Sequence, residues 1–121
     1  MKTLNISEET YDKIKDQLGE NTSGIKLYKD YVIVRTYSAG VHAGILSERD
    51  GKEVVLKNAR RLWYWDGAAT LSQLAMEGTS KLEDCKFPQE VDEIILTEAI
   101  EIIPCTNTAQ RSIRSVKVWK E

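Results

Sequence analysis

Residues 31–65 read YVIVRTYSAGVHAGILSERDGKEVVLKNARRLWYW, and this stretch decides the fold class. The first seven residues are β-branched or aromatic except for one arginine, which is typical of a β-strand. The pair Asp50-Gly51 predicts a hairpin turn, and Gly44 indicates a bulge or a close contact in the strand before it. We therefore expect a meander of three antiparallel strands over 31–37, 41–48 and 52–65, with residues 58–59 as the point where the third could break.

Capping residues and hydrophobic spacing predict the elements on either side of the meander. Ser7 is a typical helix N-cap, Thr70 and Gln73 stand in capping-box spacing, and Gly19 and Gly78 are typical C-terminal stops. We expect helices over 7–18 and 70–78, a loop over 79–90, strands over 91–96 and 99–103, and a last short helix capped by Thr106 or Thr108. The predicted fold class is α+β: an N-terminal helix, the meander, two further strands and two or three short helices around one small antiparallel sheet.

Length and composition place the chain among ordinary globular domains. With 121 residues there is room for one core, so residues 1–121 are expected to form a single domain. The 17 basic and 19 acidic residues give a net charge of −2. This balance argues against general nucleic-acid binding. No apolar run approaches the roughly 20 residues that cross a bilayer, so no membrane association is expected. The absence of an export signal and the presence of two cysteines predict a cytoplasmic protein with free thiols.

Metal-binding and catalytic motifs are missing from the sequence. The chain has one histidine, His42, and its two cysteines, Cys85 and Cys105, form no C-x-x-C pair. No glycine-rich phosphate loop precedes a predicted helix. We therefore expect no metal, no cofactor and no enzymatic activity.

The densest chemical feature is residues 58–66, NARRLWYWD, with two arginines and three consecutive aromatic residues. If a strand runs through this segment, Arg61, Trp63 and Trp65 share one face, and Arg60 and Tyr64 share the other. A guanidinium beside indole rings can neutralise a phosphate and stack on a base. The alternative is that the tryptophans pack in the core and the arginines line a subunit interface, which would suggest a homo-oligomer.

A second candidate set lies at residues 106–114. Thr106 and Asn107 precede a predicted helix that carries Arg111 and Arg114 on one face, an arrangement suited to anions. The alternative is an ordinary cap followed by a solvated basic helix. His42, on the second strand, is a further candidate ligand contact or else a partly buried ring. Arg35 lies within an apolar strand and is expected to have a partner, which could be Asp66, another acidic side chain or a ligand.

Four strings within the chain resemble a widespread family of small phage and prophage proteins of unknown function. They are residues 31–44, 58–65, 68–75 and 98–106, and the resemblance extends over roughly residues 28–119. The resemblance implies a viral origin and an early accessory role. Phage proteins of this size without catalytic motifs include the sponges of the Thoeris and CBASS anti-defence kind, which capture nucleotide immune signals.

The expected function is therefore that of a phage anti-defence protein that sequesters a cyclic nucleotide or cyclic ADP-ribose-type signal without degrading it. Its ligand-binding residues are expected to be His42, Arg60, Arg61, Trp63, Tyr64, Trp65, Thr106, Asn107, Arg111 and Arg114. One alternative is an inhibitor of a host enzyme that acts through the acidic stretch 77–101, provided that Glu90, Asp92, Glu93, Glu98 and Glu101 form one exposed face. Another is a small nucleic-acid-binding accessory protein that uses the arginine–tryptophan face.

Overall fold

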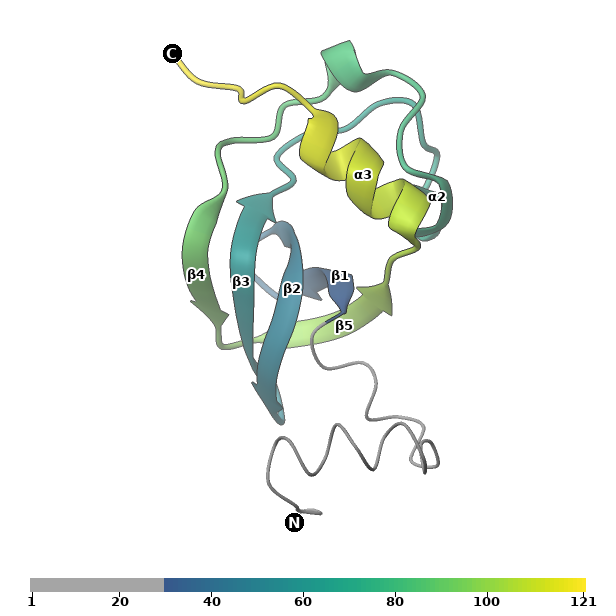
Figure 1. Cartoon of the computed structure of the whole chain (residues 1–121). Coiled ribbons are helices and arrows are strands. Elements are labelled where there is room, and N and C mark those ends of the chain that lie inside the picture. Colours follow the sequence, from purple (N-terminus) through teal and green to yellow (C-terminus); the bar gives the residue numbers. More distant parts are fainter. Residues whose placement is uncertain (1–29) are drawn as a thin grey trace, which may run out of the picture.

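The computed structural model describes residues 30–121, and the helix expected over 7–18 lies outside this range (Figure 1). The elements are β1 (Tyr31–Thr36), β2 (Val41–Asp50), β3 (Glu53–Arg61), α2 (Leu71–Glu77), the 3-10 helix η2 (Leu82–Asp84), β4 (Val91–Leu96), β5 (Ala99–Pro104) and α3 (Asn107–Ser115). The meander and the two later strands are confirmed. The described part of the chain is mostly β, with two short α-helices, so only the coarser part of the α+β prediction holds.

The five strands form one antiparallel sheet that is rolled on itself. Their order is β4-β3-β2-β1-β5, so β4 and β5 lie at opposite edges although only residues 97–98 separate them in sequence. Figure 1 shows β4 running directly into β5, which closes one end of the sheet. The backbone N–H of Ala99 donates to the carbonyl of Lys52 in the β2–β3 turn (3.0 Å). The sheet is therefore a small open barrel, a curvature that the strand pattern did not predict.

The β2–β3 hairpin contains a bulge opposite Gly44. Ala43 pairs with Arg60 and Ile45 with Lys57, which leaves one extra residue on β3, and Asn58 within this bulge has a φ of 50°. A Cβ at Gly44 would lie 3.0 Å from the Cα of Ala59, so the predicted close contact and irregularity are confirmed. The hairpin turn itself is Gly51-Lys52, one residue later than predicted, because Asp50 pairs with Glu53.

The third strand is shorter than predicted and ends at Arg61 instead of residue 65. After it, the N–H of Leu62 donates to the carbonyl of Val41 (2.8 Å), and Tyr64 pairs with Lys86 in an isolated bridge outside the sheet. The prediction failed because aromatic residues favour strands in general, and here the same residues continue as an irregular segment across the barrel mouth.

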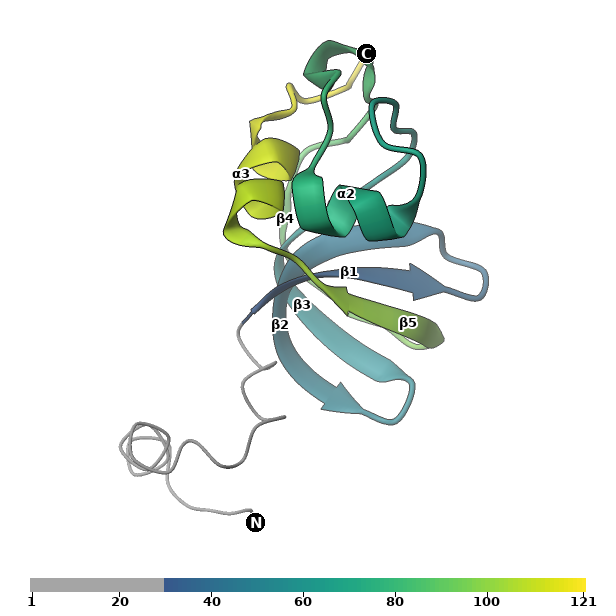
Figure 2. The same cartoon turned by 90° about the vertical axis from the view of Figure 1, so that its right-hand side faces the viewer.

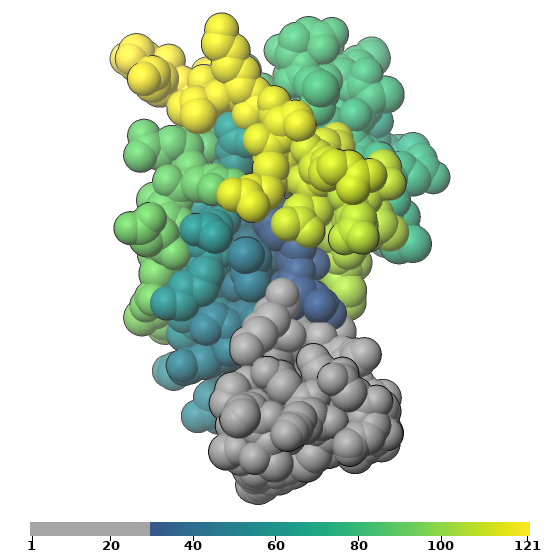
Figure 3. All heavy atoms as spheres, viewed as in Figure 1, coloured from purple at the N-terminus to yellow at the C-terminus, as the bar shows by residue number. Residues whose placement is uncertain are grey.

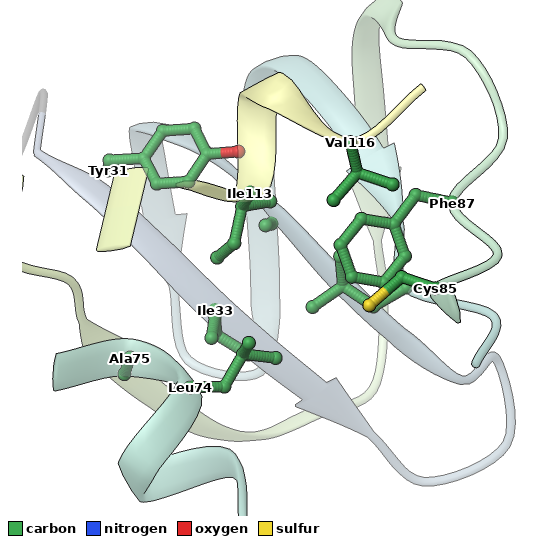
Figure 4. Packing of buried hydrophobic residues seen from close by; sticks show 10 residues of the cluster. Tyr31, Ile33, Leu74, Ala75, Cys85, Phe87, Ile113 and Val116 are labelled. Carbon is green, nitrogen blue, oxygen red and sulfur yellow. The ribbon is translucent and has the colours of Figure 1, made fainter. Parts of the chain in front are cut away.

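Two apolar clusters stabilise the fold, and β1 contributes to both. Tyr31 and Ile33 pack with α2, α3 and Phe87 on one side of the sheet (Figure 4). Val32 and Val34 pack inside the barrel with residues of β2, β3 and β4. Burial on both faces explains why β1 reads as a continuous apolar run. Figure 2 shows α2 and α3 side by side over the β1 side of the sheet.

The predicted helix ends are confirmed by their hydrogen bonds. The Thr70 hydroxyl accepts from the N–H of Gln73 (3.1 Å), and Gly78, with φ of 78°, ends α2. The cap of α3 is Thr106 and not Thr108, because the Thr106 hydroxyl accepts from the N–H of Ala109 (3.0 Å). No helix between residues 30 and 121 is long and apolar enough to cross a membrane.

Candidate ligand-binding site

Arg61 and Trp63 form a ridge between two surface hollows. The first, the barrel-mouth cavity, has a volume of about 370 Å³ and lies at the open end of the barrel. The second, the turn-side groove, has a volume of about 470 Å³ and lies beside the β1–β2 turn. Both side chains line both hollows, so a ligand in either would meet a cation next to an indole ring. Volumes of this size are usual for small-molecule sites.

The barrel-mouth cavity combines apolar walls with a few polar groups. Its walls include Ala59 of β3 and Val91 and Ile94 of β4. Gln89 of the loop before β4 is a polar neighbour, and His42 of β2 also lines the cavity although its side chain is almost fully buried. His42 is paired with Arg61 across the β2–β3 ladder, which places both side chains on the barrel face. Gln89 and Ile94 were not predicted as site residues, and no local sequence signal marks them, because the pairing of β4 with β3 brings them to this position.

The turn-side groove brings Trp65 to the ridge. It is lined by residues 38–41 of the turn together with Arg61, Trp63 and Trp65. Trp65 is half-buried and packs against the cluster beneath the helices, whereas Trp63 is 60% exposed. The three side chains expected to share one strand face thus line one groove, although the segment after Arg61 is not a strand.

Arg61 is the exposed arginine of the pair and has no ion-pair or hydrogen-bond partner among residues 30–121. Its charge is instead close enough to His42 to lower the pKa of that ring, after the larger effect of burial. An exposed guanidinium beside an exposed indole is suited to an anionic aromatic ligand.

Arg60 requires a correction, because it is 3% exposed and cannot serve as a ligand contact. Its Nε donates to the carbonyl of Pro88 (2.7 Å), and its two terminal nitrogens donate to Ile113 (2.9 Å) and Phe87 (3.1 Å). Burial lowers the pKa of the guanidinium from its usual value. Because Ile113 lies in the last turn of α3, Arg60 ties β3 to that helix end and is a structural residue.

Tyr64 lies on a different part of the surface from the two hollows and lines neither of them. The Lys86 ammonium lies 5.9 Å from its ring centroid and 5.6 Å from that of Trp119. The Trp119 ring also meets the Trp63 ring edge-to-face, with 5.9 Å between centroids. The backbone N–H of Trp119 donates to the carbonyl of Phe87 (3.0 Å). Trp119, which was not predicted as a site residue, thus supports the ridge from the C-terminal segment.

The residues predicted on α3 are separate from the ridge. Arg114 makes a two-pronged ion pair with Glu90 (2.8 and 3.0 Å), and Thr106 is occupied by its cap and by the carbonyl of Met76 (2.8 Å). Asn107 and Arg111 are exposed, and Figure 3 shows α3, in yellow, on the outer surface. None of the four lines either hollow, so the structure divides the predicted site into two parts.

Several carboxylates of the stretch 77–101 have basic partners. Glu101 accepts from Arg35 (2.8 Å), which identifies the partner expected for that arginine, and Glu93 accepts from Lys57 (2.6 Å). With the Glu90–Arg114 pair, three of the five carboxylates expected to form an acidic face are neutralised locally. Within residues 30–121 no three His, Cys, Asp or Glu side chains are grouped as metal ligands.

The fold and its ridge define a small open β-barrel domain with two helices over the sheet and two hollows at one end. Residues 29–113 match the family described as Domain of unknown function (DUF6948), and the chain belongs to this family. No curated protein matches the chain.

Proposed function

We propose that this protein binds a small nucleotide at the Arg61–Trp63 ridge and sequesters it without chemical change. The finer proposal is that it is a phage anti-defence protein whose ligand is a cyclic nucleotide or cyclic ADP-ribose-type immune signal. The observation that supports nucleotide binding is the ridge itself: an exposed guanidinium and an exposed indole ring stand between two hollows of ligand size. The resemblance to small phage proteins supports the choice of an immune signal.

A nucleotide matches both components of the ridge. Its phosphate carries the charge that Arg61 would neutralise, and its base offers a flat surface for Trp63 or Trp65. Hydrogen bonds to charged groups contribute about 1.5–3 kcal/mol each, so Arg61 alone would account for a tenfold or larger part of the affinity. Sequestration needs only such binding contacts and no general base.

We include a subunit interface in this proposal because Trp63 remains 60% exposed and both hollows are open. A second copy placed over the ridge would remove water from the bound nucleotide and strengthen its contacts. Sedimentation of the protein with and without nucleotide measures this part of the proposal directly.

The two alternatives receive less support. An inhibitor acting through the acidic stretch would lose part of its charge to the Arg35, Lys57 and Arg114 ion pairs. A nucleic-acid-binding protein would need several free cations along one groove, whereas one arginine lines these hollows.

A thermal-shift screen tests the proposal. The panel contains cyclic di- and trinucleotides, cyclic ADP-ribose isomers and short oligonucleotides. A ligand at about 100 times its Kd adds roughly 2.7 kcal/mol to the free energy of unfolding, a shift on the order of 10 °C for a domain of this size. The bound nucleotide should be recovered intact after the complex is denatured.

Three variants make the screen specific. Arg61→Met and Trp63→Leu should each weaken binding at least about tenfold, while Arg49→Met, which removes an exposed arginine of the β2–β3 hairpin, should leave the Kd unchanged. A shift seen only with oligonucleotides and abolished by moderate salt would favour the nucleic-acid alternative. No shift with any compound would overturn the proposal and direct attention to a protein partner.

A further inference from the structure

The two hollows share one wall. Among residues 30–121, only Arg61 and Trp63 line both of them. The barrel-mouth cavity extends from this ridge toward Ile94 of β4, and the turn-side groove extends toward Ala39 of the β1–β2 turn and toward Trp65. The hollows are therefore neighbours on either side of the ridge, and a ligand that crosses the ridge can occupy both.

The position of the charge indicates which part of such a ligand lies at the ridge. Arg61 is the only arginine, lysine, aspartate or glutamate among the residues 30–121 that line the hollows, and it is exposed. Val91 and Ile94 offer apolar contacts in the barrel-mouth cavity, as does Trp65 in the turn-side groove. An anion far from the ridge would lose hydration without gaining an opposite charge. We therefore expect the anionic group at Arg61 and the uncharged rings in the hollows.

A phosphodiester has the chemistry that this arrangement requires. It carries one negative charge, which one guanidinium can neutralise, and its two ester bonds lead away in two directions. In a 3′,5′-cyclic mononucleotide both ester bonds return to the same nucleoside, so one hollow would remain filled with water. When the phosphodiester joins two nucleosides, each hollow can receive one of them. The volumes of about 370 and 470 Å³ lie toward the lower end of the usual range for ligand pockets, as expected for hollows that each take part of a ligand.

The tryptophans offer ring surface to both halves of such a ligand. Trp63 borders both hollows, and its edge-to-face contact with Trp119, at 5.9 Å between centroids, supports the ring although it is 60% exposed. Trp65 adds a second indole on the side of the turn. Stacking on an aromatic ring is open to every base, so this surface favours a second base without choosing its identity.

We infer that the ligand is a dinucleotide that lies across the ridge, with its phosphodiester at Arg61 and one nucleoside in each hollow. This inference rests on the proposed function and deepens it, because it selects a two-base nucleotide over a cyclic mononucleotide or a cyclic ADP-ribose-type signal, which has one base. Both hollows are open, so the second phosphodiester of a cyclic dinucleotide can remain in water.

The first test changes the ligand and leaves the protein intact. Wild-type protein is titrated in a calorimeter with 3′,5′-cyclic AMP, the linear dinucleotide ApA and cyclic di-AMP, and then with the three corresponding guanine compounds. In at least one base series, a dinucleotide should bind at least about tenfold more tightly than the cyclic mononucleotide, because a second stacked base contributes that much or more. Equal affinity, tighter binding of the mononucleotide, or no binding by any of the six overturns the inference.

The second test fills one hollow at a time. Val91→Phe enlarges an exposed side chain in the barrel-mouth cavity, and Ala39→Phe does the same in the turn-side groove. In each variant the advantage of the dinucleotide over the cyclic mononucleotide should fall below about threefold. The matched controls are Ile95→Phe in β4 and Tyr37→Trp beside the turn, two exposed positions that line neither hollow and should keep the full advantage. An advantage that survives in either filled variant overturns the inference.

A third measurement does not depend on the folding of a variant. In 15N-labelled wild-type protein, the backbone amide of Ile94 reports on the barrel-mouth cavity and that of Gly40 on the turn-side groove. Both signals should move along one binding curve when the tighter dinucleotide is added. Movement confined to the residues of one hollow overturns the inference.

The outcomes separate this inference from the proposed function. If Arg61→Met weakens cyclic mononucleotides and dinucleotides alike and the dinucleotides have no advantage in the wild type, nucleotide binding stands and the two-base ligand falls. If none of the six compounds binds but a cyclic ADP-ribose isomer does, the result is the same. If Arg61→Met changes none of the affinities, the proposed site itself is wrong.

Discussion

Replacing each of the two adjacent arginines with methionine separates a structural role from a binding role. Arg60 and Arg61 differ by one position in β3, yet the first is buried beneath α3 and the second lies exposed on the ridge. Methionine keeps an unbranched apolar side chain that extends as far as the Nε position of arginine, so Arg60→Met removes only the guanidinium group, whose central carbon lies 5.5 Å from the centroid of the Phe87 ring. We expect Arg60→Met to lose stability and keep binding, and Arg61→Met to do the reverse.

The loss for Arg60→Met follows from its three hydrogen bonds. At about 1.5–3 kcal/mol for each bond to a charged donor, the sum would be roughly 5–9 kcal/mol. Part of it is offset, because methionine avoids the desolvation of a buried guanidinium. In addition, the carbonyls of Phe87 and Ile113 keep a second donor each, from the N–H of Trp119 and Val116 respectively. The carbonyl of Pro88 loses its donor, and we expect a net loss of about 3 kcal/mol.

Urea unfolding followed by far-ultraviolet circular dichroism measures both changes. Arg60→Met should lower the free energy of unfolding by about 3 kcal/mol with an unchanged m-value, and Arg61→Met should remain within about 0.5 kcal/mol of the wild type. Binding of the nucleotide found in the screen is then measured below the transition, where both variants are folded.

Two results would refute the reasoning. If Arg60→Met is as stable as the wild type, the three carbonyl contacts contribute nothing net, and burial of this arginine is not what fixes α3 on β3. If Arg61→Met loses as much stability as Arg60→Met, the two side chains do not differ in burial as described.

Three further predictions concern the barrel and its helices. Gly44→Ala should lower the free energy of unfolding by about 1–3 kcal/mol, measured by urea unfolding, because its Cβ would lie 3.0 Å from two backbone atoms of the β3 bulge. Burial lowers the pKa of His42 from its ordinary value of 6.5, so on acidification the unfolded chain binds a proton that the folded chain does not. The free energy of unfolding should therefore fall as the pH drops below about 6.5, by at most about 1.4 kcal/mol per pH unit. This contribution to the slope should vanish in His42→Phe. Thr106→Ala should cost about 1–2 kcal/mol through its lost cap, while an unchanged Kd in calorimetry would place Thr106 outside the binding site.

Local signals in the sequence predicted the strands and caps because short-range chemistry decides them. The β1 run, the Thr70 cap and the close contact at Gly44 depend on residues near each other in the chain. The rolled shape depends instead on β5 pairing with β1, across about 70 residues, and no local pattern encodes that pairing. The pairing of β4 with β3 is likewise non-local, so the sequence did not indicate that Gln89 and Ile94 line the same cavity as Arg61.

The arginine pair shows where strand periodicity stops being informative. Alternation correctly places Arg60 and Arg61 on opposite faces of β3, but it gives no sign of which face is covered. That depends on α3 and the loop around Phe87, whose carbonyls are the acceptors that make a buried guanidinium tolerable. Because Arg60 donates to those carbonyls on one face of β3, Arg61 lies on the opposite face, where it pairs with His42 of β2 at the barrel mouth. Burial of the Arg60 face of β3 under α3 thus places Arg61 on the face that lines the two hollows, where its guanidinium is available to a ligand.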